Sequence, residues 1–200
     1  MTVAEAPLAG DGRIARGRRT RSAIVAAAVA LIEAGDAAPT ARRIAASAGV
    51  SERALFLHFP DLESLHAAVA EGFLEQAVAP VAALDPRLPL PLRLGRFCGR
   101  RAVLLERITP LRRVALRYEQ GSPALQASRR RWAALARQEL SRVFAAELRA
   151  TPRSQLTLSA ALAVTGWGAW DELRSEQGLS VEAAAAAMEL ALERVLSIGR

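Results

Sequence analysis

Apolar residues recur at the spacing of one helix face over most of this sequence. The first such run places small and branched side chains three and four residues apart: Ile24, Ala27, Ala28, Leu31 and Ile32. This spacing is that of an amphipathic helix, whereas a half-buried strand would alternate apolar and polar residues. Aromatic residues make up only 4% of the chain, and Ala and Leu, which are strong helix formers, take their place. The sequence therefore predicts an all-α fold.

Turn residues and prolines divide this helical pattern. Helices are predicted, approximately, over residues 41–48, 52–59, 62–79, 92–107, 110–119, 124–148 and 155–174, with a first helix around 24–32 that ends before Gly35 and a last helix that follows Ser180 and includes Val195. Prolines at positions 80, 86, 89 and 91 cannot lie within one continuous helix. We therefore place a domain boundary there and expect a flexible basic arm over 1–17, a first domain over 18–79 and a second helical domain over 80–200.

The charge of the chain favours partners that are polyanions. The formal net charge is +7, the sequence pI is about 11.2, and all 27 basic residues are arginine. Such a balance is typical of proteins that bind nucleic acid or another polyanion. Residues 86–153 are the most basic part, with 16 arginines against four acidic residues. Charge alone therefore does not locate a DNA-binding surface, and the arginines of the arm fit either a solvated tail or a segment that reaches phosphates.

Residues 40–59, TARRIAASAGVSERALFLHF, have the pattern of two short helices joined by a tight turn. Thr40 and Ser51 are good N-caps for the two helices, because their hydroxyls accept hydrogen bonds from free backbone N–H groups. Gly49 tolerates the positive φ that the turn requires. This arrangement is a helix-turn-helix, whose second helix enters the major groove of DNA.

The predicted second helix would present Glu52, Arg53 and Leu57 to base edges, and Ser51 would leave its N-terminal amides near a phosphate. A solvated Glu52 and a purely structural His58 remain open alternatives, as does a buried helical hairpin without a role in DNA binding. Phe56 is expected to be half core and half backbone contact.

The residues from Arg19 to Phe73 resemble the tetracycline-repressor (TetR) family of regulators. The resemblance is carried by Thr40, Ile44-Ala45, Ala48-Gly49-Val50-Ser51, Leu55, His58-Phe59 and Leu65. It implies a sequence-specific regulator of transcription that binds double-stranded DNA, with repression as the commoner mode in the family. The DNA contacts that it implies, together with those argued above, are Thr40, Arg42, Arg43, Ser51, Glu52, Arg53, Phe56, Leu57 and His58.

Several positions depart from the family pattern: Phe56 and Leu62, and also Arg43, Arg53 and Ala54, where the family often has an acidic residue, a small residue and Thr. Phe56 stands where the family usually has Tyr, so a hydroxyl that typically donates to phosphate is lost, and Leu62 stands where Lys is common. Arg42, Arg43, Arg53 and the arginines of the arm could compensate. The alternative function is a ligand-binding or protein-interaction relative that has lost its affinity for DNA.

The resemblance also implies a homodimer built from the last two helices and a palindromic operator. The segment 155–174 is apolar on more than one face, with Leu156, Ala160, Ala163 and Trp167 on one and Leu158 and Leu162 on another. A helix that is apolar all round must be buried. A helical core within one chain is the other explanation of this pattern.

A small-molecule effector site in the second domain is the last feature that the resemblance implies. The candidate wall residues are Phe97, Cys98, Arg101, Leu105, Tyr118, Trp132 and Trp167. Arg101 lies four residues after Phe97 on a largely apolar stripe, where it could pair with an acidic ligand or extend to solvent over the apolar surface. The basic segment 86–153 fits an anionic ligand or a solvated basic face equally well.

The remaining signals argue against other classes of protein. We expect no enzyme, because no nucleophile–base grouping, metal-ligand spacing or phosphate-binding glycine loop is recognisable. No cofactor and no metal are expected, and a lone Cys98 excludes a disulfide within the chain and is best explained as a small buried hydrophobe. No secretory signal or membrane span is recognisable, so we expect a cytoplasmic protein with no membrane partner.

Overall fold

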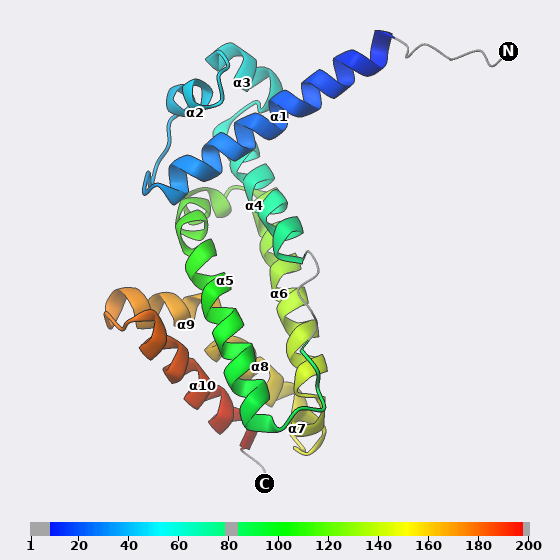
Figure 1. Cartoon of the computed structure of the whole chain (residues 1–200), viewed down its shortest axis with the longest axis vertical. Coiled ribbons are helices and arrows are strands. Elements are labelled where there is room, and N and C mark those ends of the chain that lie inside the picture. Colours follow the sequence, from blue (N-terminus) through cyan, green and yellow to red (C-terminus); the bar gives the residue numbers. More distant parts are fainter. Residues whose placement is uncertain (1–8, 79–83, 198–200) are drawn as a thin grey trace, which may run out of the picture.

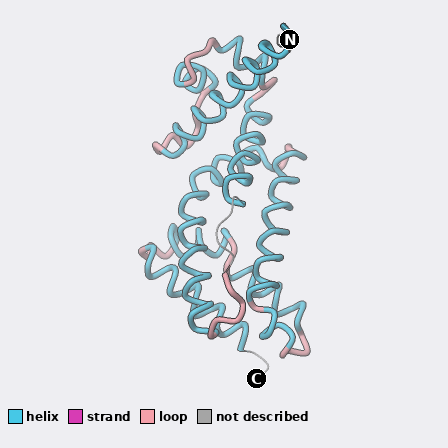
Figure 2. The backbone as a smooth tube through the Cα atoms, turned by 45° about the vertical axis from the view of Figure 1, so that its right-hand side comes forward, coloured by secondary structure: helices cyan, strands magenta, loops and turns pink. Residues whose placement is uncertain are grey.

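The computed structural model describes residues 9–78 and 84–197, and this part of the chain is helical with connecting loops and no strand (Figures 1 and 2). The all-α prediction is confirmed. The helical elements are α1 (Ala9–Glu33), α2 (Ala41–Ser47), α3 (Glu52–His58), α4 (Leu62–Val78), α5 (Leu90–Glu119), α6 (Pro123–Val143), α7 (Ala145–Arg149), α8 (Ser154–Val164), α9 (Trp167–Asp171), the π-helical turn η1 (Glu172–Glu176) and α10 (Val181–Ser197).

Helices α1, α2 and α3 form one end of an elongated molecule, and α5 and α6 run antiparallel along its length (Figure 1). Ile24, Ala28 and Ile32 of α1 are buried, as their spacing predicted. Helix α1 begins at Ala9, however, so the expectation of a flexible arm over 1–17 is wrong for residues 9–17. Arginine and alanine are good helix formers, which the apolar periodicity does not register. Residues 1–8 of that arm lie outside the described part of the chain.

Helix α4 connects the two ends of the molecule. Val69 and Phe73 on α4 share a buried cluster with residues of α1 and with Leu111 and Val114 of α5. The boundary that we expected at the prolines therefore does not separate two independent cores, because α4 packs on α5 and α6 as well as on α1. Pro80 and the predicted end of this helix at residue 79 lie outside the described part.

A single helix, α5, replaces the two helices predicted over 92–107 and 110–119. Pro110 lies inside it. A proline in a helix lacks the N–H that would bond to the carbonyl of Glu106, at a cost of about 3 kcal/mol. Burial of Leu105, Leu111 and Val114 on both sides of the proline holds the segment in helical form. Tertiary packing therefore overrides the local signal.

Two other predicted helices are interrupted. The predicted helix over 124–148 divides at Phe144, which has φ −110° and ψ 29° and is completely buried. The predicted helix over 155–174 divides at Thr165 and Gly166 into α8, α9 and η1. A Cβ atom on Gly166 would lie 3.0 Å from the carbonyl oxygen of Leu162, so a side chain at this position would require a shift of the backbone.

A second buried cluster lies among α5, α6, α8, α9 and α10. It includes Phe97, Phe144, Trp170 and Met188. One ion pair closes its far end: Arg93 at the start of α5 donates to both carboxylate oxygens of Glu147 on α7, at 2.8 and 2.6 Å. The Nε and one terminal nitrogen of Arg93 also donate to the carbonyl oxygens of Leu88 and Val143. The pair therefore ties α7 and the end of α6 to the beginning of α5.

Candidate functional site

The N-caps of α2 and α3 and the glycine turn between these helices are formed by the residues that the sequence predicted for these roles. The Thr40 hydroxyl accepts from the backbone N–H of Arg43 at 3.3 Å. The Ser51 hydroxyl accepts from the backbone N–H of Ala54 at 3.1 Å. Gly49 in the turn has a φ of +68°. The helix-turn-helix geometry therefore follows from local chemistry at three positions.

The inner faces of the two short helices are completely buried. Ile44 on α2 and Leu55 on α3 have no exposed surface, and Phe59 directly after α3 is 1% exposed. The guanidinium of Arg21 lies 4.4 Å from the centre of the Phe59 ring, which is cation–π distance. The pair of helices is thus fixed on α1 and cannot be reoriented without opening this core.

The outer face of α3 is free of contacts that would bury it. Glu52 and Arg53 are exposed, Phe56 is 44% exposed and Leu57 is 78% exposed. His58 is half-buried, and its ring lies close to Gly17 of α1, where a Cβ atom would be 3.9 Å from Cε1. The three residues expected to face base edges therefore share one accessible surface, and His58 lies at its edge beside α1.

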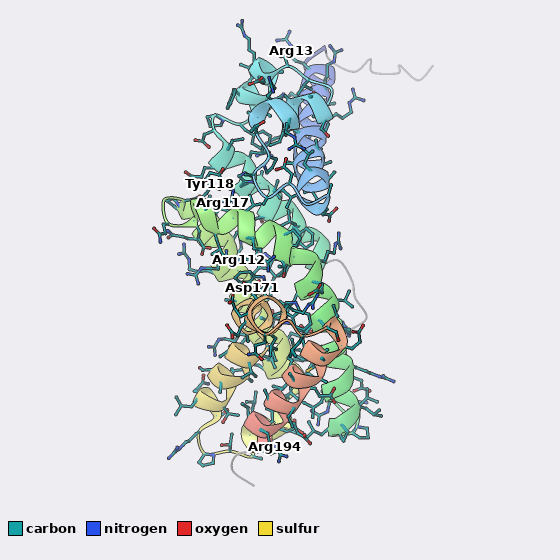
Figure 3. The ribbon with its side chains drawn as sticks, turned by 90° about the vertical axis from the view of Figure 1, so that its left-hand side faces the viewer. Arg13, Arg112, Arg117, Tyr118, Asp171 and Arg194 are labelled. Carbon is teal, nitrogen blue, oxygen red and sulfur yellow. The ribbon has the colours of Figure 1, made fainter. Side chains whose placement is uncertain are left out.

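Arginines surround this surface on α1 and α2. Arg42 and Arg43 are exposed, and Arg43 forms an ion pair with Asp36 at 2.7 Å. Arg13 lies near the N-terminal end of α1 (Figure 3). Helix α1 carries an exposed basic series at positions 13, 16, 18, 19 and 21, of which 13 and 16 lie in the segment that was expected to be a flexible arm.

A cavity of about 580 Å³ lies between α4, α5, α6 and the junction of α8 and α9. Four of the residues that were expected to line an effector site line this cavity, namely Arg101, Leu105, Trp132 and Trp167. The other three are not part of its wall. Phe97 and Cys98 are buried in the adjoining core, where burial raises the pKa of the Cys98 thiol to about 12. Tyr118 instead stacks on His66, with ring centres 4.9 Å apart.

The basic side chains of the cavity wall differ in their partners. Arg112 and Arg129 both pair with Glu119. Arg101 donates from Nε to the carbonyl oxygen of Thr165 at 3.0 Å, and burial lowers its pKa, an effect that nearby Glu139 partly offsets. Figure 3 shows Arg112 on α5 between Tyr118 and Asp171.

Sequence reasoning missed five polar residues of the wall: His66, Arg112, Ser128, Arg129 and Arg137. His66 is 3% exposed, and its burial lowers its pKa from 6.5 to about 4. A usable signal existed, because His66 precedes Ala70 and Phe73 by four and seven residues and thus shares their helix face. Ser128 and Arg137 offered no comparable signal, since the polar residues of a helix are usually solvated.

Helices α8 and α10 expose apolar side chains on the surface of the single chain. Leu156 is 67% exposed and Leu190 is 55% exposed, and Ala160 and Ala163 are exposed as well. Leu158, on the other face of α8, is buried. The core of one chain therefore accounts for one apolar face of α8 and leaves the other uncovered.

None of the helices within the described ranges is long and apolar enough to cross a membrane. Within the same ranges, no three side chains of His, Cys, Asp or Glu lie where they could hold a metal ion.

Comparisons with known proteins agree with this geometry. Residues 24–69 match the family model described as bacterial regulatory proteins, tetR family. The fold is similar to that of a transcriptional regulator from Rhodococcus sp. Rha1 (TM-score 0.67, 20% identity, 90% of this chain and 95% of the other). A TetR-family regulator from Mesorhizobium loti MAFF303099 gives a TM-score of 0.68 at 20% identity over 92% and 98% of the two chains.

A third solved structure, the multidrug binding protein EbrR complexed with imidazole, has a TM-score of 0.57 at 20% identity and covers 86% of this chain and 93% of its own. No curated protein matches the sequence. The family model covers the helix-turn-helix and the helices that hold it, and the solved structures share the fold of nearly the whole chain. Residues 24–69, which hold the helix-turn-helix, therefore match the tetR family of bacterial regulatory proteins, and the chain as a whole has the fold of the solved regulators.

Proposed function

We propose that this protein is a ligand-responsive repressor that binds a palindromic operator as a homodimer. The observation that carries the proposal is the exposed face of α3, where Glu52, Arg53 and Leu57 project from a helix whose opposite face is fully buried. A rigid helix with exposed polar side chains can read base edges in the major groove. Residues 18–79 would form the DNA-binding domain, and residues 80–200 would form the effector and dimerisation domain.

Separate roles are proposed for the arginines near α3. Arg53 lies on the outer face of α3, so we assign it to base readout, for which arginine hydrogen bonds to guanine are the commonest means. Arg42 lies on α2, which crosses the DNA backbone in this motif, so we assign it to a phosphate. Arg43 is held by Asp36 and would have to exchange this partner for a phosphate. Thr40, Ser51, Phe56 and His58 complete the proposed contact surface.

The uncovered face of α8 supports the dimer. Leu156, Ala160 and Ala163 are exposed on it, and Leu190 adds an apolar side chain on α10. Small residues allow two helices to approach closely, and contiguous apolar surface of this kind marks an interface. A two-fold dimer would present its two recognition helices to half-sites about 34–36 Å apart.

Response to a ligand is supported by the position of the cavity. Its wall includes Ile32 of α1 and His66 of α4 as well as side chains of α5 and α6. A molecule in the cavity would thus contact the helices that carry the DNA-binding surface. For it to act as an inducer, it must bind more tightly to the conformation that does not bind DNA. EbrR has been solved with imidazole bound, which makes a small-molecule site in this fold a reasonable expectation.

The test is selection of bound fragments from random double-stranded DNA at two salt concentrations. We expect a palindromic consensus and an affinity that falls by about 10³–10⁵ between 50 and 200 mM salt if six to ten phosphates are contacted. Arg53→Ala should lose affinity mainly for the consensus, by about 1–3 kcal/mol, and Arg42→Ala should weaken binding to all sequences alike. Arg130→Ala, an exposed position on α6, is the matched control.

A folded dimer that enriches no sequence and binds DNA with a flat salt response would overturn the proposal. That result would favour a relative that has lost its affinity for DNA. The exposed rings and methyl groups of Phe56 and Leu57 would then be part of a surface for another partner. Exchange of the effects expected for Arg42 and Arg53 would instead mean that their roles are reversed.

A further inference from the structure

The cavity wall combines a large apolar surface with positive charge and no negative charge. Leu104, Ile108, Trp132, Leu162 and Trp167 are among its apolar residues. Its basic residues are four arginines, at positions 101, 112, 129 and 137. No Asp or Glu of the described residues lines it. A site of this composition repels cations and offers a neutral or anionic organic molecule a largely apolar surface.

The four arginines are not equally available to a ligand. Arg112 and Arg129 share the carboxylate of Glu119, so their charges are already partly neutralised. Neither Arg101 nor Arg137 forms an ion pair with any residue in the described ranges. Arg101 is the more deeply placed, half-buried, with its Nε bonded to the carbonyl oxygen of Thr165. A buried charge without an ion-pair partner is costly. The charge of Glu139 offsets part of this cost for Arg101, and an anion beside Arg101 would remove more of it.

Two further polar groups face the cavity without a partner. The Nε2 atom of His66 and the Oγ atom of Ser128 are buried and make no hydrogen bond to any described residue. Both side chains line the cavity, and each residue is 3% exposed. Because burial holds the pKa of His66 at about 4, the ring is neutral near pH 7 and can donate or accept one hydrogen bond at Nε2. Buried polar groups are nearly always satisfied, so these two atoms point to a ligand.

The two arginines without an ion pair, Arg101 and Arg137, lie at the opposite end of the cavity from the uncharged polar groups of His66 and Ser128. Helices α5 and α6 run antiparallel (Figure 1). Arg101 contacts Thr165 at the junction of α8 and α9, and His66 stacks on Tyr118 near the end of α5. On α6, Ser128 and Arg137 are nine residues apart, which is about 14 Å along the helix axis. The apolar residues of the wall lie between these two ends.

We propose that the effector of this protein is an amphipathic organic anion. Its carboxylate or equivalent anionic head pairs with Arg101, with Arg137 at the rim. Its apolar body packs between α5 and α6, and a hydrogen-bonding group at the other end meets His66 and Ser128. This inference rests on the proposed function for its biological meaning, but the binding chemistry is independent of DNA. The volume of about 580 Å³ lies within the ordinary range for small-molecule sites.

A matched pair of fluorescent probes tests the charge of the ligand. The probes are 8-anilinonaphthalene-1-sulfonate and N-phenyl-1-naphthylamine, which share one aromatic skeleton and differ by the sulfonate. Both are titrated into the full-length protein without DNA, and energy transfer from the tryptophans, of which Trp132 and Trp167 line the cavity, reports binding to the protein. The Arg101 variant then tests whether the probe is in the cavity. We expect the sulfonate to bind at least as tightly as the neutral probe, although the neutral probe is the more hydrophobic.

Single substitutions then test which arginine causes the preference for the anionic probe. Arg101→Gln should weaken binding of the sulfonate by about tenfold or more, because a hydrogen bond to a charged group is lost. Its affinity for the neutral probe should change by less than about twofold. Arg130→Gln makes the same change of charge at an exposed position of α6 outside the cavity wall and should affect neither probe.

The outcomes separate this inference from the proposed function. If the wild-type protein binds the neutral probe more tightly than the sulfonate, the anionic class is wrong, and this result does not depend on whether Arg101→Gln folds. Equal loss of both probes in Arg101→Gln, or equal loss of the sulfonate in Arg130→Gln, would also overturn it. None of these results bears on operator binding, which the DNA selection tests without any probe.

Discussion

The buried ion pair between Arg93 and Glu147 allows a prediction of stability with a defined magnitude. Their side chains are only 6% and 4% exposed, and two hydrogen bonds join them at 2.8 and 2.6 Å. The substitution Glu147→Gln keeps the shape of the side chain and removes its charge. The guanidinium of Arg93 would then be buried with the carbonyl oxygens of Leu88 and Val143 and the new amide as its acceptors. Removal of one partner from such a pair costs about 3–5 kcal/mol.

We expect the lower end of that range, about 3 kcal/mol, because these two carbonyl contacts are retained. The free energy of unfolding of a protein at the upper end of the small-protein range falls by about 3 kcal/mol per M urea, so the urea midpoint of the variant should be lower by about 1 M. The measurement is urea denaturation followed by far-UV circular dichroism. The chain concentration is held constant, since a dimer unfolds in a concentration-dependent way.

The control is Glu71→Gln, which removes the same charge from an exposed pair. Arg131 and Glu71 have side chains that are 56% and 33% exposed, and pairs of this kind contribute about 0–1 kcal/mol. A midpoint shift for Glu147→Gln that is no larger than the shift for Glu71→Gln would refute the reasoning. The double substitution Arg93→Met with Glu147→Leu should recover most of the lost stability, because apolar residues often replace a buried pair without net cost.

Three further outcomes are expected. Gly49→Ala should destabilise the protein by about 1–2 kcal/mol in the same assay, because φ is +68° and a left-handed conformation is strained for a residue with a Cβ atom. The pKa of His66 is about 4 in the folded state and 6.5 in the unfolded state. The neutral ring therefore contributes fully to the free energy of unfolding above pH 6.5, and this contribution is lost as the pH falls. Between pH 7.5 and 5 the free energy of unfolding of the wild type should fall by about 2 kcal/mol more than that of His66→Phe. Leu156→Glu should shift the protein from dimer to monomer in sedimentation without loss of helix content, since this side chain is 67% exposed in the single chain; an unchanged dimer would place the interface elsewhere.

The features that were predicted correctly from the sequence are those with a local cause. The N-caps Thr40 and Ser51 accept the hydrogen bonds expected of them. Each of these interactions depends on residues within three positions of one another. The prediction of a turn at Gly49 likewise needed only the conformational freedom of glycine.

The features that were predicted wrongly depend on packing between distant segments. Pro110 ends a helix by local rules, but the buried residues on either side of it keep α5 continuous. Phe144 is a residue that local propensity would keep in a helix, and it instead ends α6 where it enters the core against Phe97, with ring centres 5.4 Å apart. Such interruptions depend on the shape of the space in the core that a side chain fills. That shape is set by residues distant in the sequence, so local patterns do not predict it.

The candidate sites show the same difference between features with a local cause and features that depend on packing between distant segments. The exposed residues of α3 could be named in advance, because a helix-turn-helix fixes which face of its second helix is free. The cavity could only be guessed from large side chains near one another in the sequence. Phe97 and Cys98 belong to the core instead, whereas His66 comes to the wall from the other domain. A cavity wall is assembled from several helices, so sequence neighbours are poor guides to it.

The shared wall has a consequence for how a ligand could control DNA binding. His66 and Phe73 of α4 line the cavity, and Phe73 also belongs to the buried cluster that contains Ile24 of α1 and Leu55 of α3. A ligand that displaces α4 would therefore disturb the packing that sets the position of α3, because close-packed interiors transmit small shifts. Since coupling is reciprocal, an effector that weakens operator binding by some factor must itself bind more weakly, by the same factor, when operator is present.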